Sequence, residues 1–173
     1  MTGVVYKSTG SWYWVKSDDG ILHQCRIKGK FRLKGIKSTN PISVGDKVHF
    51  ELEKKGDDEI GVISTIFERD NFIVRKSVNL SKQTHIIAAN LDLVFLLITI
   101  DNPPTFPAFI DRFLVTAEAY SIPTVIVFNK IDLLSDKDLE ILANIENIYS
   151  KAGYKTLRTS ADKQINIDTL KSL

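Results

Sequence analysis

Two long apolar runs constrain the fold of this chain most strongly. The run Leu91–Ile100 is almost continuously apolar, and a second such run, Ile122–Phe128, follows it. Continuous apolar strands are typical of parallel sheets that bury both strand faces. Between the runs, Phe106–Tyr120 carries apolar residues at helical spacing, with Pro107 in the first turn, where proline is tolerated. The pattern predicts a strand, a helix and a second strand.

A second helix and a third strand extend this pattern. The segment from Ser135 to Asp138 resembles a capping box, and it opens a predicted helix that Gly153 ends. Tyr154–Thr159 then predicts a third, shorter strand. Units of this α/β kind have right-handed crossovers, and their binding sites lie at the carboxyl ends of the strands. Chemistry is therefore expected in the loops that follow these strands.

The first 66 residues follow a different, all-β pattern. Turn signals separate five β-rich runs, which are Val4–Ser8, Trp12–Lys16, Ile21–Ile27, Lys47–Glu53 and Ile60–Phe67. Five short strands with one longer middle connection predict a small barrel of the OB type, which commonly binds nucleic acid, although an SH3-like barrel fits nearly as well. The predicted domains are a barrel at 1–68, a linker and lead-in segment at 69–90, and an α/β domain at 91–173.

Composition narrows the class of protein. Of 173 residues 43% are hydrophobic, and 23 Lys and Arg nearly balance 21 Asp and Glu. These values exclude a disordered chain, and the net charge is too small to indicate a nucleic-acid binder by itself. The single Cys25 excludes an intrachain disulfide and a multi-cysteine zinc site. Because no signal-like or membrane-length apolar run occurs, we expect a cytoplasmic protein without a membrane partner.

Positive charge is nevertheless concentrated in one segment of the predicted barrel. Six basic residues and no acidic one occur there, namely Arg26, Lys28, Lys30, Arg32, Lys34 and Lys37. The first five alternate, so an extended chain places them on one face, and Trp12, Tyr13 and Trp14 lie on a neighbouring strand. Basic groups neutralise phosphates, and aromatic rings stack on bases. The alternative is a solvated edge strand protected by lysines, with the tryptophans divided between core and surface.

The strongest chemical signal directly follows the second apolar run. Asn129, Lys130 and Asp132 form an Asn-Lys-x-Asp motif. A carboxylate such as Asp132 can accept from both N1–H and the 2-amino group of guanine, whereas adenine would leave it unsatisfied. The Lys130 stem can lie along the base, and the Asn129 amide can hold the base-binding loop together. The motif predicts a guanine site.

A second motif follows the third predicted strand. Ser160 and Ala161 occupy a tight loop whose backbone N–H could meet the guanine O6. A P-loop, in contrast, is missing, because Gly29-Lys30 precedes Phe31 and the sole glycine after Gly61 is Gly153. The chain therefore has base-recognition motifs without a phosphate cradle, and no catalytic residue is assigned to it.

This order of motifs resembles the circularly permuted GTPases. The segments that carry the resemblance are Ile87–Asp92, Ile110–Leu114, Asn129–Leu134, Gly153-Tyr154 and Ser160-Ala161, with Arg69–Lys76 similar to the junction in front of the GTPase domain. The preceding barrel narrows the resemblance to the ribosome-small-subunit-dependent GTPase A family, also called RsgA or YjeQ. In that family the P-loop comes after these motifs. Since the sequence stops at Leu173, we expect it to be the N-terminal part of such a protein.

The resemblance implies a late maturation factor of the small ribosomal subunit. The complete protein would bind GTP or GDP and hydrolyse GTP under stimulation by the subunit, and the barrel would bind rRNA. By position, Asn129, Lys130 and Asp132 would read guanine, while Ser160 and Ala161 would close the base pocket. Magnesium and a structural zinc are expected only in the complete protein, which is expected to be a monomer. The chain alone is expected to be inactive.

Two other functions stay open at this point. The chain could be a non-hydrolysing rRNA-binding protein with a vestigial nucleotide pocket, in which case guanine nucleotides would not affect its binding to rRNA. It could also be a different α/β enzyme that contains Asn-Lys-x-Asp by chance. The second alternative lacks support, because the sequence has no nucleophile elbow, His–carboxylate motif or dinucleotide fingerprint to supply a catalytic group.

Overall fold

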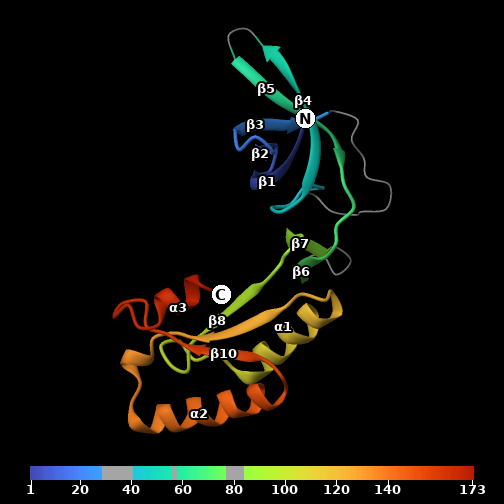
Figure 1. The fold of residues 1–173 in the computed structure, drawn as a ribbon. Coiled ribbons are helices and arrows are strands. Elements are labelled where there is room, and N and C mark those ends of the chain that lie inside the picture. The colour runs from blue at the N-terminus through green and yellow to red at the C-terminus, as the bar shows by residue number, and fades with distance from the viewer. Residues whose placement is uncertain (29–40, 56–57, 77–83) are drawn as a thin grey trace. The chain divides into compact units, whose positions relative to one another are not determined.

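The chain divides into two compact units, Met1–Leu91 and Asp92–Leu173. A computed structural model describes residues 1–28, 41–55, 58–76 and 84–173 (Figure 1). No helix in these ranges is both long enough and apolar enough to cross a membrane.

A closed five-stranded barrel forms most of the first unit. Its strands are β1 (Thr2–Thr9), β2 (Trp12–Ser17), β3 (Leu22–Ile27), β4 (Lys47–Lys55) and β5 (Asp58–Ile66). They pair in the order β1-β2-β3-β5-β4, and β4 returns to β1. Within the barrel only β3 and β5 run parallel. The prediction of five strands closing an OB-type barrel is confirmed.

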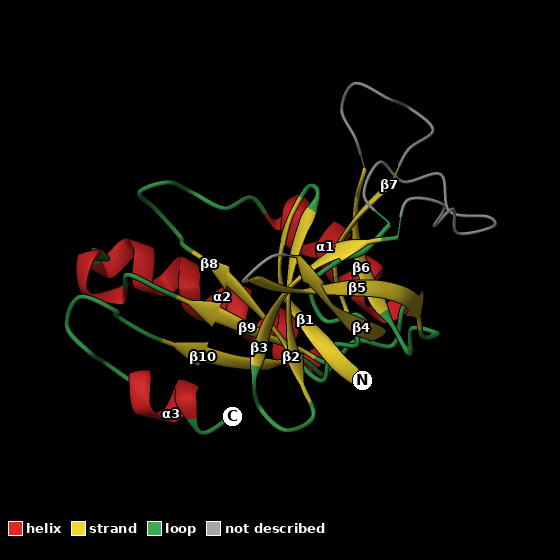
Figure 2. Cartoon of the chain, turned by 90° about the horizontal axis from the view of Figure 1, so that it is seen from above, coloured by secondary structure: helices red, strands yellow, loops and turns green. Residues whose placement is uncertain are grey.

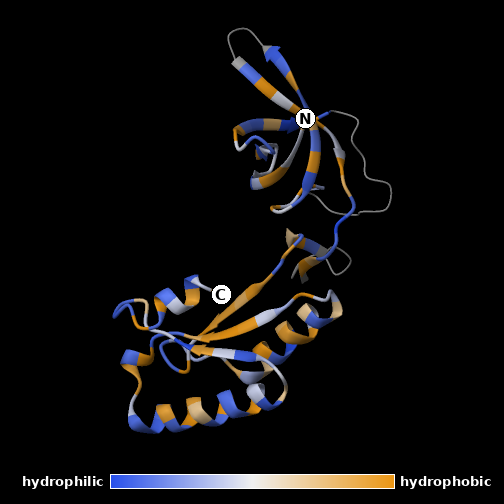
Figure 3. Ribbon diagram, viewed as in Figure 1, coloured by the Kyte–Doolittle hydropathy of each residue, from blue (hydrophilic) through white to orange (hydrophobic). Residues whose placement is uncertain are grey.

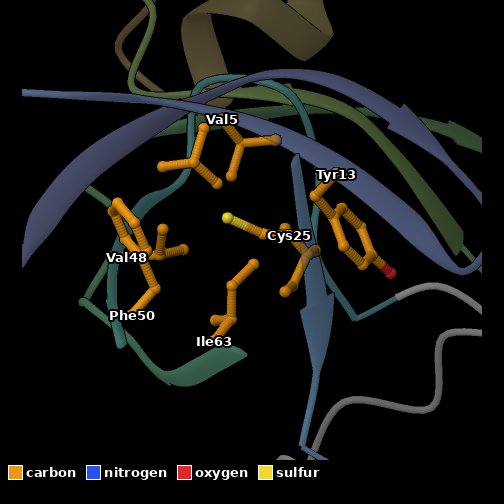
Figure 4. Close-up of a cluster of buried hydrophobic side chains, with 8 residues drawn as sticks. Val5, Tyr13, Cys25, Val48, Phe50 and Ile63 are labelled. Carbon is orange, nitrogen blue, oxygen red and sulfur yellow. The ribbon is translucent and has the colours of Figure 1, made fainter. Parts of the chain in front are cut away.

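Alternate residues of the strands fill the barrel core. The buried cluster consists of Val5, Tyr13, Val15, Cys25, Ile42, Val48, Phe50 and Ile63 (Figure 4). The Cys25 sulfur lies inside this cluster, and burial raises the pKa of its thiol to about 11. A Cβ at Gly61 would overlap that sulfur, so this position needs glycine. Cys25 therefore acts as a small hydrophobic core residue.

Strand β3 has partners on both sides, because it pairs with β2 and with β5. The ladder with β2 covers Leu22–Cys25 and the ladder with β5 covers Cys25–Ile27, so Arg26 is paired with β5 alone. The alternative of a solvated edge strand for the basic segment therefore stays open. Lys28 follows β3 and is exposed, while its amide donates to the carbonyl of Ile63 at 3.2 Å. The other basic residues of the predicted RNA-binding segment, Lys30, Arg32, Lys34 and Lys37, lie outside the described residues.

Strands β6 (Phe72–Lys76) and β7 (Thr84–Ala89) form an antiparallel pair within the first unit. Both strands fall in the segment 69–90, which the sequence predicts as a linker and lead-in segment. The domain boundaries at 68 and 90 stay predictions. The Ala89 amide donates to the carbonyl of Val44 at 2.9 Å. Gly45, at φ +87°, approaches the Ala89 carbonyl so closely that no Cβ fits between them. Backbone contacts thus attach this strand pair to the barrel.

A buried ion pair strengthens the same attachment. Arg69 donates from Nε to Oδ1 of Asp46 at 2.6 Å and from Nη2 to Oδ2 at 2.7 Å. The Asp46 side chain is 0% exposed and that of Arg69 is 9% exposed. Asp46 also accepts from the Ser43 amide, and Arg69 also donates to the carbonyl of Pro41. These additional hydrogen bonds are what a buried ion pair needs to offset the loss of hydration.

We expect Asp46→Asn to lower the free energy of unfolding of the first unit by about 3 kcal/mol or more. The substitution keeps the shape of the side chain but leaves Arg69 buried without a counter-ion, which is strongly destabilising. Urea unfolding followed by tryptophan fluorescence measures this change, because both tryptophans, Trp12 and Trp14, lie in this unit.

The neighbouring ion pair Lys47–Asp70 provides the matched control. Its atoms are 3.3 Å apart, but the side chains are 54% and 74% exposed. Because exposed pairs contribute little, Asp70→Asn should cost less than about 1 kcal/mol. Equal losses for Asp46→Asn and Asp70→Asn would contradict the importance given to the buried pair.

The second unit contains a three-stranded parallel sheet with two long helices. Its strands are β8 (Val94–Ile98), β9 (Thr124–Phe128) and β10 (Lys155–Arg158), and its helices are α1 (Pro107–Ala119), α2 (Asp136–Lys151), the short 3₁₀ helix η1 (Ile131–Leu133) and α3 (Ile167–Lys171). The strands lie side by side in the order β10-β9-β8 (Figure 2). The predicted order of three strands and two helices is confirmed. Helix α3 was not predicted, because five residues are too few to reveal a periodicity.

Helices α1 and α2 cover the same face of this sheet (Figure 1). Their shared core contains Leu96, Ile98, Ile110, Leu114, Ile126, Phe128, Leu142 and Tyr149. The Tyr149 hydroxyl joins the two helices by donating to Asp111 Oδ1 at 2.8 Å. Burial raises the pKa of Tyr149, and the neighbouring Asp111 carboxylate raises it further. The predicted capping box at Ser135 and Asp138 is present at the start of α2.

The two predicted apolar strands differ in burial. From Val125 to Phe128, β9 is buried on both faces, but in β8 Phe95 is 40% and Leu97 is 59% exposed. The expectation that the first run is buried on both faces is therefore wrong for β8. Within the described residues β8 pairs only with β9, and α1 and α2 cover only one of its faces. Hydropathy does not distinguish the strands, because both are strongly apolar (Figure 3).

Candidate functional site

The carboxyl ends of β9 and β10 bring the two predicted motifs together. Arg158 lies beside Phe128 in the parallel ladder, so the loops that follow them leave the sheet as neighbours. The Thr159 amide donates to the Phe128 carbonyl at 2.7 Å, and the Ile131 amide donates to the Thr159 carbonyl at 3.2 Å. The register of the sheet thus places the Asn-Lys-x-Asp loop against the Ser-Ala loop.

The side chain of Asn129 connects these two loops directly. Its Oδ1 accepts from Thr159 Oγ1 at 3.2 Å and from the Ala161 amide at 3.1 Å. Its backbone amide donates to the carbonyl of Ile98, the last residue of β8, at 2.8 Å. The Asn129 Nδ2 group donates to none of the described residues. Asn129 therefore holds the site together through its oxygen and keeps a donor for another molecule.

Lys130 extends the connection to a third loop. It adopts the left-handed conformation, with φ 63° and ψ 33°, at the start of η1. Its Nζ donates to the carbonyl of Asn102 at 2.6 Å, in the loop between β8 and α1. The aliphatic stem of Lys130 therefore runs between the loop after β8 and the loop after β9.

Asp132 lies in η1 and is exposed. Among the described residues no side chain or backbone amide forms a hydrogen bond or ion pair with its carboxylate. The carboxylate is therefore able to accept two hydrogen bonds from one ligand, which recognition of guanine N1–H and the 2-amino group requires.

The loop after β10 is built by its own hydrogen bonds. Ser160 is fully buried, and its Oγ accepts from the Lys163 amide at 3.0 Å. The backbones of Ser160 and Ile165 exchange two hydrogen bonds, and Asn166 Nδ2 donates to the carbonyl of Arg158 at 2.8 Å. The Ser160 side chain thus shapes the loop, while the exposed Ala161 is its accessible part.

The sequence predicts that a backbone N–H of this loop meets guanine O6, and the amide of its accessible residue, Ala161, already has an acceptor in Asn129 Oδ1. An oxygen of a bound base would have to share this N–H with the amide oxygen. Shared, three-centre hydrogen bonds of this kind are common in proteins.

Sequence reasoning missed Asn102 and Glu146, which shape the site, and it gave Thr159, directly before Ser160, no role of its own. Thr159 and Asn102 contact the motif residues as described above, and Glu146 on α2 accepts from Arg158 Nε at 2.9 Å and Nη2 at 2.5 Å, which anchors the end of β10. None of them stands at a motif position. Asn102 and Glu146 are distant from both motifs along the chain, so only the sheet topology brings them near the site.

Potential metal ligands are not grouped among the described residues. Among the described residues no cluster of three or more His, Cys, Asp or Glu side chains could hold an ion. We therefore assign neither magnesium nor zinc to these residues. Both ions were predicted only for the complete protein, and that prediction stays open.

We expect Asn129→Ala to increase hydrogen exchange at the Ala161 amide and to lower the stability of the second unit by about 1–3 kcal/mol. The substitution removes the acceptor of two hydrogen bonds and leaves the buried Thr159 hydroxyl without one of its partners. Hydrogen exchange followed by NMR measures both effects. Asn129→Asp is the control, because it keeps an acceptor oxygen in place and should leave the Ala161 amide protected. Equal exchange in both variants would show that the acceptor does not hold the loop.

Comparison with known proteins agrees with this architecture. The family model described as RsgA GTPase matches residues 66–173, and the model described as RsgA N-terminal domain matches residues 2–63. The small ribosomal subunit biogenesis GTPase RsgA of Flavobacterium johnsoniae is 61% identical over 173 residues, which cover 100% of this chain and 53% of that protein. The protein of the same name from Christiangramia forsetii is 58% identical over 171 residues, which cover 99% of this chain and 54% of that protein. The chain spans about half the length of these curated relatives.

Two solved structures share the fold. YjeQ from Thermotoga maritima superposes with a TM-score of 0.75 at 33% identity, covering 99% of this chain and 55% of that chain. YloQ, described as a circularly permuted GTPase, gives a TM-score of 0.64 at 28% identity. The match covers 93% of this chain and 52% of the YloQ chain. The α/β unit is therefore part of a circularly permuted GTPase fold that follows a five-stranded barrel. By sequence and by structure, the chain belongs to the RsgA GTPase family.

Proposed function

We propose that this chain is the guanine-recognising and RNA-binding half of a GTPase that acts in the biogenesis of the small ribosomal subunit. The observation that carries the proposal is the Asn129 amide oxygen bound to the Ala161 loop, with the open carboxylate of Asp132 in the same motif. Relatives that cover the whole chain are named as GTPases of that process.

Each group of the site has a partner on guanine. Asp132 would accept from N1–H and the 2-amino group, and Asn129 Nδ2 would donate to N7 or O6. The Lys130 stem, held at its end by the Asn102 carbonyl, would lie along the base. Adenine has neither N1–H nor a 2-amino group, so it would not form the two hydrogen bonds to Asp132, and guanine would bind more tightly than adenine.

Phosphate binding and hydrolysis belong, in this proposal, to the complete protein. The chain has no glycine-rich P-loop, so base recognition alone would give an affinity of roughly millimolar or weaker. We propose that the complete protein hydrolyses GTP under stimulation by the small subunit and works in the cytoplasm as a monomer. This chain alone is proposed to be inactive.

We expect Asp132→Asn to exchange guanine selectivity for xanthine selectivity. An Asn side chain can donate to the 2-oxo group of xanthine, but it cannot accept both donors of guanine. NMR titration of the 173-residue chain with GMP and XMP at millimolar concentration measures the change through the amide shifts of residues 129–133 and 159–163, because weak binding is still visible by this method.

Asp136→Asn is the matched control, because Asp136 is another exposed acid near the motif, in the first turn of α2. It should leave the preference for GMP unchanged. If Asp132→Asn also retained that preference, Asp132 would not face the base, and the proposed site would be wrong.

For the barrel we propose rRNA binding through the basic segment from Arg26 to Lys37. Among its described members, Lys28 is exposed and forms no ion pair within the described residues. Arg26 pairs with Glu53 at 3.2 Å, but both side chains are about half exposed, so this pair is weak and can yield to a phosphate.

We expect reversal of Lys28, Lys30 and Arg32 to Glu to weaken binding to purified small ribosomal subunits and to flatten its salt dependence. Each lost phosphate contact should reduce the slope of log K against log salt by about 0.7–0.9. Binding measured over a salt series tests this. The control reverses the same amount of charge on the second unit at Lys151, Lys155 and Lys171. An unchanged slope in the barrel variant would remove this segment from the proposal.

A further inference from the structure

One outer surface of the barrel gathers aromatic and basic side chains that the proposed contacts do not use. It consists of Tyr6 and Lys7 on β1 with Trp12, Trp14 and Lys16 on β2, and we call it the aromatic face. On β2 these residues alternate with the buried Tyr13 and Val15. The aromatic face therefore contains both tryptophans of the chain, while the tyrosine between them belongs to the core.

A β-bulge enlarges this face. In the ladder of β1 and β2, Val5 lies opposite Val15 and Lys7 lies opposite Trp14, so Tyr6 is an extra residue. A bulge places two consecutive side chains on the same side of a strand. Both Tyr6 and Lys7 are exposed as a result, and Tyr6 is 59% exposed.

Ammonium groups lie over the rings of this face. Lys7 Nζ is 4.8 Å from the centre of the Trp14 ring, and Lys16 Nζ is 5.5 Å from the centre of the Tyr6 ring. Strands β1, β2 and β3 contain three basic residues, Lys7, Lys16 and Arg26, and no acidic residue. Positive charge next to the exposed Tyr6 and the partly exposed Trp14 suits a ligand that combines planar groups with negative charge.

A hollow of about 420 Å³ adjoins the face at the turn between β1 and β2. It is lined by Gly10, Ser11, Trp12, Tyr13, Arg26 and Ile27, together with Pro41. Trp12, a residue that is 37% exposed, and Arg26 offer a stacking surface and a phosphate partner at the same place.

We propose that the aromatic face binds single-stranded RNA by stacking unpaired bases on Trp12, Trp14 and Tyr6, with Lys7, Lys16 and Arg26 contacting the phosphates. This inference rests on the proposed binding of RNA by the barrel, and it specifies the kind of RNA. Stacking needs an accessible base face, which unpaired nucleotides offer and a base-paired stem does not. The basic segment Arg26–Lys37, in contrast, would attract any RNA through its phosphates.

The test uses the intrinsic fluorescence of the 173-residue chain, because both of its tryptophans lie on the aromatic face. We expect a short uridine-only oligoribonucleotide to quench this fluorescence, and a base-paired RNA stem with the same number of phosphates to bind about tenfold more weakly at equal salt. Tyr6→Leu keeps both tryptophans as reporters and should weaken single-strand binding about tenfold. Phe106→Leu, which changes a 71% exposed aromatic residue in the second unit, should have no effect.

The outcomes separate this inference from the proposal on which it depends. If the chain binds neither RNA nor purified small subunits, RNA binding by the barrel is wrong and the inference falls with it. If it binds RNA but the stem binds as tightly as the single strand, or Tyr6→Leu binds like the unchanged chain, the stacking inference alone is overturned. Circular dichroism melting of Tyr6→Leu checks that the variant is folded. The comparison of single strand and stem uses the unchanged chain, so it does not depend on the folding of any variant.

Discussion

The two hydrogen bonds accepted by the Asn129 side chain are the contacts on which the site depends. They join the loop after β9 to the loop after β10, at the edge where parallel pairing brings the strand ends together. Lys130 adds the loop after β8 through the Asn102 carbonyl. Because these side chains are occupied in holding the loops, the groups left for a ligand are few: Asp132 and the Asn129 nitrogen. The same residues therefore build the site and limit what it can recognise.

The barrel uses a comparable device at its own junction. The buried pair of Asp46 and Arg69 ties the segment that follows β5 to the turn that precedes β4, and Gly45 allows the backbone of Ala89 to approach. Asn90, within the run that resembles the permuted GTPases, donates to the Gly45 carbonyl and accepts from the Asp70 amide. Residues recognised as a family pattern thus have a structural task that the pattern does not reveal.

Several elements could be predicted because their physical signals are local. The capping box at Ser135, the stop at Gly153 and the alternating strands of the barrel each follow from neighbouring residues. The burial of β8 could not be predicted, because Phe95 and Leu97 look like core residues until the helices are placed on the opposite face. The bulge at Tyr6 was equally hidden, since no residue type in β1 demands it.

The order of the elements, the two-part organisation and the Asn-Lys-x-Asp motif can be recognised in the sequence alone. These depend on residue type and short spacing, which the chain displays directly. Which faces are covered and which side chains meet depends on the tertiary fold. The Asn129 contacts to Thr159 and Ala161, the Glu146–Arg158 pair and the aromatic face all join residues from different strands, helices or loops. Such contacts arise from strand register and helix placement, and neither is a property of any local stretch of sequence.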